Sequence, residues 1–261
     1  AEPQDTLYCG FRHKSYNDLD MEYEAEKILE TTTKFLKNAE LKKELNTNLF
    51  THGILSANHG FSVNPLKLTQ NLSKVIEKKY GVKIYENTTF LGEEKNTAKT
   101  HHGRIHYKKL ILAVDINYPS EMIKNLKSTI IITPPLTQEE LAKTGMDRKK
   151  IVFDAKKSYD YFKVTKDNRF LFGFGGIIVH KKHKKTDPHF PHLKNIENFT
   201  KKLFPYLNIE PEYAWSGTYG VTRHYEPVVE YKDNTVSIAG AGSQVVCFMA
   251  AKHVASKISA L

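Results

Sequence analysis

The clearest pattern of apolar and polar residues in this chain predicts a helix just after residue 64. Asn64 can cap that helix, and Pro65 suits its first turn. Gly81 lies where a left-handed C-cap belongs. One apolar face recurs between these two signals at helical spacing and consists of Leu66, Leu68, Leu72, Val75 and Ile76.

The rest of the first half predicts one more helix and several strands. Residues 1–16 show no regular period and are expected to be irregular, whereas helical spacing predicts a long helix from about Asn17 to Leu36. The continuous apolar run Leu110–Val114 is typical of a strand buried on both faces of a parallel sheet. Further short strands are predicted at Phe50–Ser56, Val82–Tyr85, Thr88–Glu94 and Arg104–Tyr107.

After Tyr118 short alternating segments predict an antiparallel sheet. Its expected strands are Thr129–Thr133, Ile151–Asp154, Tyr159–Thr165 and Arg169–Phe174, and a helix at Ile196–Leu207 and a further strand at Tyr213–Gly220 follow. The chain then closes with a strand at Thr235–Ala239, a glycine turn at residues 240–243 and a helix at Val245–Leu261. Such a turn directs backbone N–H groups and the positive end of a helix dipole at one spot, which favours an anion or a carbonyl oxygen.

Composition adds limits on the class of protein. The chain has 261 residues, of which 40% are hydrophobic and 26% are charged, as expected for a water-soluble globular protein. No apolar run is long enough to span a membrane, and no signal peptide is visible. The two cysteines, Cys9 and Cys247, fit a reducing compartment, so we expect a cytoplasmic protein.

A net charge of +10 favours anionic partners, although the lysines are scattered. The one dense run, residues 180–185, predicts a solvated loop, with phosphate or RNA contact as the alternative. No metal site is expected, because lysines surround the nearby histidines and no carboxylate or thiol is spaced as a ligand.

Several ordered motifs between residues 50 and 261 resemble the D-amino-acid-oxidase-like superfamily of FAD-dependent oxidoreductases. The nearest group is that of glycine, sarcosine and γ-glutamylputrescine oxidases. The similar segments are Gly60–Pro65 with its helix, Leu110–Ala113, Ile132–Leu136, Tyr161–Lys163, Asp167–Gly176, Trp215–Gly217, Thr222–Arg223 with Pro227, and Ala239–Ser243.

The resemblance implies a two-lobe α/β (α+β) fold with FAD as cofactor. It assigns residues 1–40, 57–118 and 216–261 to a partial, discontinuous FAD-binding lobe. Residues 41–56 and 119–215 would form the antiparallel-sheet substrate lobe. The implied reaction oxidises a C–N bond of a small amine or amino acid, and the flavin performs the redox chemistry without a protein nucleophile.

The family's opening strand and G-x-G-x-x-G motif are missing, so the chain resembles the fold from about thirty residues onward. Ala1-Glu2-Pro3 resembles the end of the family's second strand, where an acid binds a ribose. The resemblance therefore implies cofactor contacts at Glu2, Gly10 and Arg12, and at Gly240, Gly242 and Ser243 of the closing motif. The family usually carries a glycine after the alanine of its returning strand, where this chain has Ala113-Val114-Asp115; we expect Asp115 to face solvent, with a ribose contact as the alternative.

Three residues are candidates for contact with the substrate. Arg169 and Arg223 could supply the guanidinium that a carboxylate-bearing amine requires, and Tyr161 lies in the family's hairpin motif. A protein that has lost the cofactor and binds an acidic partner or nucleic acid through its basic surface is the main alternative. A flavoprotein that modifies tRNA is a third possibility.

Overall fold

The structure, a computed structural model, describes residues 2–11, 16–28, 32–156, 159–179 and 190–259. The chain divides into two compact units, each composed of separate stretches of sequence. Unit 1 comprises residues 1–63, 127–177 and 185–217, and unit 2 comprises residues 64–126, 178–184 and 218–261. Among the described residues, no helix is long and apolar enough to cross a bilayer.

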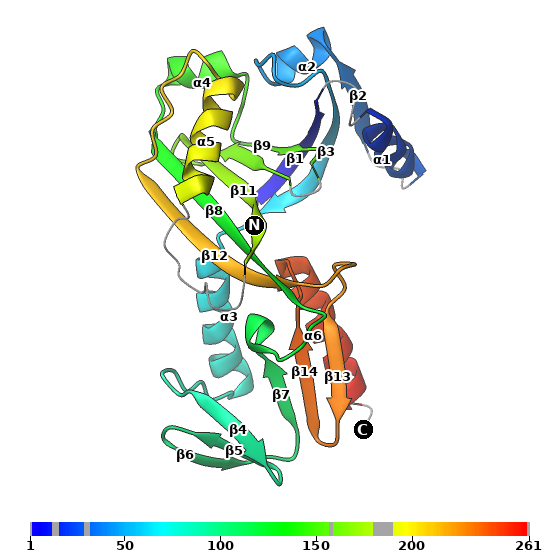
Figure 1. Ribbon diagram of the computed structural model, residues 1–261, viewed down its shortest axis with the longest axis vertical. Coiled ribbons are helices and arrows are strands. Elements are labelled where there is room, and N and C mark those ends of the chain that lie inside the picture. Colours follow the sequence, from blue (N-terminus) through cyan, green and yellow to red (C-terminus); the bar gives the residue numbers. More distant parts are fainter. Residues whose placement is uncertain (1, 12–15, 29–31, 157–158, 180–189, 260–261) are drawn as a thin grey trace. The chain divides into compact units, whose positions relative to one another are not determined.

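Unit 1 is built on an eight-stranded sheet in the order β12–β8–β11–β10–β9–β1–β3–β2 (Figure 1). β1 is parallel to β9, whereas the pairs β1–β3, β2–β3, β9–β10 and β10–β11 are antiparallel. The strands are β1 (Glu2–Gly10), β2 (Thr33–Lys37), β3 (His52–Ser62), β8 (Lys124–Pro135), β9 (Lys150–Asp154), β10 (Tyr161–Val164), β11 (Arg169–Val179) and β12 (Tyr213–Val221).

Buried apolar and more exposed residues alternate along these strands, so the apolar core of unit 1 lies on one face of the sheet. Phe162, Phe170 and Phe172 are fully buried there; Phe162 and Phe170 pack against Phe204, which follows α5, and Phe172 stacks on Phe162. The helix α1 contacts β1, β2 and β3, and Glu26 of α1 accepts a hydrogen bond of 2.6 Å from Ser56. The helices of unit 1 are α1 (Tyr16–Ile28), α2 (Ala39–Glu44), α4 (Gln138–Thr144) and α5 (Phe190–Leu203).

The structure corrects two predictions near the start of the chain. Residues 2–10 form a strand, because β3 and β9, both distant in sequence, supply its hydrogen-bond partners. The long predicted helix ends at Ile28, and β-branched Thr32 and Thr33 lead into β2. Residues 1–40 lie in unit 1, and their assignment to the FAD-binding lobe stays a prediction.

Unit 2 contains two three-stranded sheets and two long helices. One sheet has the order β13–β14–β7, and the other has the order β4–β5–β6. The elements are α3 (Pro65–Tyr80), β4 (Phe90–Glu94), β5 (Thr97–Thr100), β6 (Gly103–His106), β7 (Leu110–Ala113), the 3₁₀ turn η1 (Asp115–Asn117), β13 (Val228–Lys232), β14 (Thr235–Ala239) and α6 (Gln244–Ser259).

The helix predicted after residue 64 is confirmed with both of its caps. The Asn64 side chain accepts a hydrogen bond from the Lys67 N–H at 2.9 Å, and Gly81 has φ 67°. The parallel pairing predicted for Leu110–Val114 is also confirmed, because β7 runs parallel to β14. The predicted burial of this strand on both faces is wrong, because Ile111 is 50% exposed. The strand predicted at residues 82–85 does not form.

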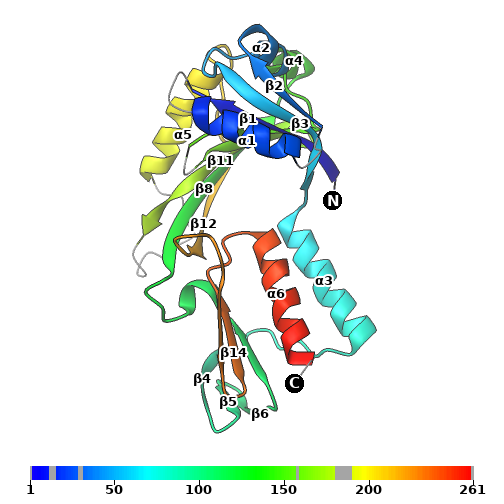
Figure 2. The ribbon, with the colours of Figure 1, turned by 90° about the vertical axis from the view of Figure 1, so that its right-hand side faces the viewer.

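Both long helices of unit 2 expose apolar side chains. Figure 2 shows α3 and α6 on the same side of the sheet that contains β7 and β14. No side chain of α3 is buried, although Leu66, Leu72 and Val75 are apolar. On α6, Ala250 and Val254 are buried, whereas Val245, Phe248 and Met249 are exposed. Patches of this kind favour association or the binding of apolar molecules.

Replacing Phe248 with Glu should reduce this exposed apolar surface at little cost in stability. Phe248 is 53% exposed, so we expect a change of less than about 0.5 kcal/mol in the free energy of unfolding. Fluorescence of a bound apolar dye should fall, and urea denaturation measures the stability. The matched control is Ala250→Glu on the same helix, which buries a charge and should destabilise the protein strongly. Undiminished dye fluorescence in Phe248→Glu would contradict the prediction.

Candidate functional site

A glycine turn joins β14 to α6 in unit 2, as the sequence predicts. Gly240 and Gly242 have φ values of 68° and 66°, in a region of backbone conformation that residues other than glycine rarely adopt. Gly240 is buried, whereas Gly242 and Ser243 are exposed. The Ser243 hydroxyl accepts a hydrogen bond of 3.3 Å from the Val246 N–H, and the Ser243 N–H donates to the Ala241 carbonyl oxygen at 2.7 Å, so both of these N–H groups are already used.

The carboxylate of Asp115 is bound to this turn instead of facing solvent. Its Oδ1 accepts a hydrogen bond of 3.0 Å from the Gly240 N–H, and its Oδ2 accepts one of 2.9 Å from the Gly220 N–H. Asp115 itself has φ 42°, in the left-handed region that few residues other than glycine, asparagine and aspartate adopt. The expectation that Asp115 ends its strand in solvent is therefore wrong.

The geometry of the turn decides which of its groups can hold a cofactor. The N–H groups of Gly220 and Gly240 are taken by Asp115, so an anion would have to displace that carboxylate. Gly242, Ser243 and the start of α6 are exposed and carry the positive end of the helix dipole. These residues fit an electron-rich oxygen of a flavin, whereas Gly240 acts through the shape of the turn.

The face of the unit 1 sheet opposite the apolar core carries a row of aromatic side chains. Tyr8 stacks on Phe153 with ring centroids 5.1 Å apart, and Phe153 lies 6.3 Å from Tyr161. Tyr161 pairs with Gly173 of β11, and a Cβ atom on Gly173 would lie 2.1 Å from the Tyr161 ring. Glycine at position 173 is therefore required for the ring to lie across the sheet.

The predicted substrate residue Arg169 is engaged within unit 1. Its Nε donates to Asp167 at 2.7 Å, and its Nη1 donates to the Thr133 carbonyl oxygen at 3.0 Å and also contacts Glu212. These contacts fix the end of β11 to neighbouring segments. Arg223 is an exposed residue of unit 2, in the turn after β12.

The other predicted cofactor residues lie in or next to β1 of unit 1. Glu2 forms an ion pair with Lys166, and Gly10 pairs with His52, whose ring lies over it. Arg12 and the lysine run at residues 180–185 lie outside the described residues. The structure thus brings Gly240, Gly242 and Ser243 together in unit 2. Lys163, two residues after Tyr161 on the same sheet face, was missed, although it belongs to the same sequence motif.

A buried ion cluster lies on the core side of the unit 1 sheet. The Lys156 ammonium contacts Asp154 at 2.5 Å and Asp160 at 2.6 Å, and both carboxylates are almost completely buried. The same ammonium lies 5.1 Å from the ring centre of Phe11 and 4.8 Å from that of Phe199. Burial raises the pKa of Asp160, the nearby Asp154 raises it further, and Lys156 opposes this rise.

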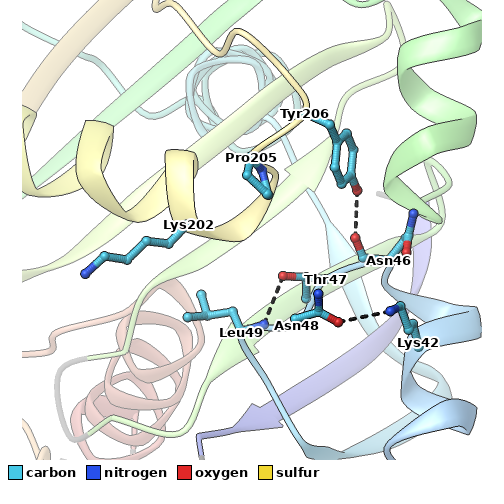
Figure 3. Close-up of a pocket in the computed structure, with 8 residues that line it drawn as sticks. All are labelled: Lys42, Asn46, Thr47, Asn48, Leu49, Lys202, Pro205 and Tyr206. Carbon is cyan, nitrogen blue, oxygen red and sulfur yellow. Dashed lines mark hydrogen bonds between the residues drawn. The ribbon is translucent and has the colours of Figure 1, made fainter.

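A pocket of about 300 Å³ in unit 1 is separate from these groups (Figure 3). Its polar side chains are largely occupied by the surrounding loops. Tyr206 donates to the Asn46 carbonyl oxygen at 2.6 Å, and Lys42 donates to Asn48 at 3.0 Å. None of the predicted site residues lines it.

Comparisons with known proteins agree with the resemblance found in the sequence. A family model described as "DAO: FAD dependent oxidoreductase" matches residues 1–257. Gamma-glutamylputrescine oxidoreductase of Escherichia coli (strain K12) is 25% identical over 192 residues, which cover 70% of this chain and 43% of that protein. The chain therefore spans less than half the length of this curated relative.

Solved structures support the same fold. Glycine oxidase from Geobacillus kaustophilus matches with a TM-score of 0.77 at 14% identity, covering 92% of this chain and 65% of that one. L-proline dehydrogenase from P. horikoshii matches with a TM-score of 0.73 at 18% identity, covering 94% and 68% of the two chains. These likenesses confirm the predicted α/β fold class.

Replacing Asp115 with Asn should destabilise unit 2. The amide has only one acceptor oxygen, so one of the two hydrogen bonds to Gly220 and Gly240 is lost, at a cost of about 1–3 kcal/mol. Asp233→Asn is the matched control, because Asp233 also has positive φ, at 49°, but is exposed. Urea denaturation measures both variants, and equal stabilities would contradict the prediction.

Replacing Asp160 with Asn should change how stability depends on pH. Because the folded pKa of Asp160 is raised, the folded protein binds this proton more tightly than the unfolded chain does. The wild type therefore loses stability as the pH rises from the ordinary aspartate pKa through the raised value. Asn stays neutral, so the melting temperature of the variant relative to the wild type should rise over that interval. A difference that is constant with pH would refute this.

Proposed function

The chain belongs to the family of FAD-dependent oxidoreductases, and on that premise we propose that it takes part in oxidising a C–N bond of a small amine or amino acid. The names of the similar proteins, which include a putrescine derivative, glycine and proline, support this class of substrate. Because the chain spans only part of its relatives' length, the activity of the whole protein is a proposal.

The observation that carries the proposal is the strand, glycine turn and helix of unit 2. FAD, when bound, would accept the electrons of the C–N bond. The N–H groups at Gly242 and at the start of α6 would stabilise negative charge at a flavin oxygen, since these residues are exposed and lie at the positive end of a helix, whereas the Ser243 N–H already donates to the Ala241 carbonyl oxygen at 2.7 Å. The Asp115 carboxylate would stabilise the conformation of the turn through its hydrogen bond from the Gly240 N–H.

Each unit has a proposed part in this function. Unit 2 would supply the flavin-binding residues, and the face of the unit 1 sheet opposite the apolar core would contact the substrate at β9 and β10. Tyr161 is the predicted substrate residue whose position supports that role best, because its ring lies on this face.

A binding module without cofactor is the second candidate. The observation in its favour is that Asp115 already fills the N–H groups of Gly220 and Gly240. A net charge of +10 would then favour an acidic partner.

A titration with FAD tests the proposal directly. We expect a saturable change in the visible spectrum of FAD and a higher melting temperature, because a ligand that binds only the folded state stabilises it. Gly242→Val should weaken binding at least tenfold, since a side chain would cover the turn.

Gly81→Val is the matched control, because Gly81 has nearly the same φ, 67°, but caps α3. Absence of binding to a chain that circular dichroism shows to be folded would favour the module without cofactor.

A further inference from the structure

The pocket in unit 1 is built from residues that the proposed site does not use (Figure 3). Its volume of about 300 Å³ lies at the lower end of the range, roughly 300–1,000 Å³, in which proteins bind small molecules. The lining comes from α2, from the end of α5 and from the segments that follow these helices. The lining residues are Lys42, Asn46, Thr47, Asn48, Leu49, Lys202, Pro205 and Tyr206.

Hydrogen bonds within the protein hold the walls of this pocket in place. The Tyr206 hydroxyl shares its proton between the Asn46 carbonyl oxygen at 2.6 Å and the Lys143 carbonyl oxygen at 2.8 Å. Burial raises the pKa of Tyr206, so this hydroxyl stays a donor at neutral pH. In the adjoining loop the Leu49 N–H donates to the Thr47 hydroxyl at 3.2 Å. A pocket whose walls are already fixed loses little conformational freedom when a ligand binds.

These contacts occupy oxygen atoms and leave donor groups for a ligand. The Lys42 ammonium donates one proton to Asn48 Oδ1 at 3.0 Å, and an ammonium has three. Because the Asn48 amide accepts through its oxygen, its NH₂ group can donate to a ligand. Lys202 adds a second ammonium from the last turn of α5. The pocket therefore offers two cations and an amide donor.

No carboxylate compensates the two positive charges of the pocket. Within the part of the chain that the structure describes, no acidic side chain lines the pocket, and neither Lys42 nor Lys202 forms an ion pair. Lys201, next to Lys202 on α5, differs because it pairs with Glu197 at 2.7 Å. A concave site with two uncompensated cations attracts anions, and the net charge of +10 adds to this attraction.

The kind of cation indicates which anion fits. Lysine binds phosphate as a compact point charge, whereas the planar fork of arginine matches a carboxylate, and the described lining contains no arginine. Two ammonium groups balance the charge of about −2 that a phosphate monoester carries at neutral pH. Beside them, Leu49, Pro205 and the ring of Tyr206 form an apolar wall that can contact an organic group.

We propose that this pocket binds the phosphate monoester of a small organic molecule. Lys42 and Lys202 would contact the phosphate, and the ring of Tyr206 would contact the organic group. The pocket contains neither the glycine turn of unit 2 nor Tyr161. The inference therefore goes beyond the proposed function and does not depend on it.

The test uses phenyl phosphate as the probe and calorimetric titration of the whole chain. Inorganic phosphate lacks the ring and benzoate carries only one charge, so each should bind about tenfold more weakly or worse. Because the second pKa of a phosphate monoester is about 6, the affinity for phenyl phosphate should rise from about pH 5 to about pH 7.

Variants of adjacent lysines separate the pocket from general positive charge. Lys42→Met and Lys202→Met should each weaken binding about tenfold, as expected for loss of a hydrogen bond between charged groups. Lys43→Met and Lys201→Met are the matched controls, because these lysines lie in the same last helical turns but do not line the pocket. Both controls should bind phenyl phosphate as the wild type does. All four lysines are exposed, so each variant should fold, and its melting temperature verifies this.

The proposal is overturned if the wild type does not bind phenyl phosphate, or if the control variants weaken binding as much as Lys42→Met and Lys202→Met do. Equal affinity for inorganic phosphate and phenyl phosphate would also overturn it, since no organic group would then be recognised. Phenyl phosphate should leave the FAD titration unchanged, and competition between them would place the phosphate in the flavin site and refute a separate pocket. Failure of FAD binding with intact phenyl phosphate binding would contradict the proposed function alone.

Discussion

The arrangement of unit 1 depends on the two-residue period of its central strands. Burial of Phe162, Phe170 and Phe172 fixes the register of β10 and β11, because a shift by one residue would turn all three rings to the other face. The same register determines that Tyr161 and Lys163 share the opposite face. The apolar core thereby positions polar side chains that it never contacts.

Two charged side chains, Asp115 and Lys163, illustrate opposite uses of charge. Asp115 satisfies both carboxylate oxygens with backbone N–H groups, so its charge stabilises the protein's own turn. Lys163 is held by neutral oxygens and retains a proton for donation. The hydrogen-bond partners, and not exposure alone, distinguish a structural ion from a group available to a ligand.

Local signals in the sequence were sufficient where the stabilising contacts are local. Asn64, Pro65 and Gly81 defined α3, and the glycines at 240 and 242 defined the turn before α6. β1 was missed because its partners lie far along the chain, and its polar residues Gln4, Asp5 and Thr6 obscure any alternation. β13 was also missed, although Asp233 and Asn234 mark the tight turn of its hairpin with β14. The partners of Arg169 and Lys163 could not be predicted, since Glu212, Gln4 and Ser62 are brought near only by the completed sheet.

The position of β1 between β3 and β9 has a consequence for how the protein is synthesised. Asp5 pairs with Lys150, so this part of the sheet cannot close until the ribosome has released a large part of the chain. Until then β1, β3 and β2 can form only a three-stranded sheet in which β1 is an unpaired edge, and such an edge is prone to aggregation. Contacts so distant in sequence also slow folding. We therefore expect the yield of active protein in cells to depend on the speed of translation and on chaperones that shield this edge.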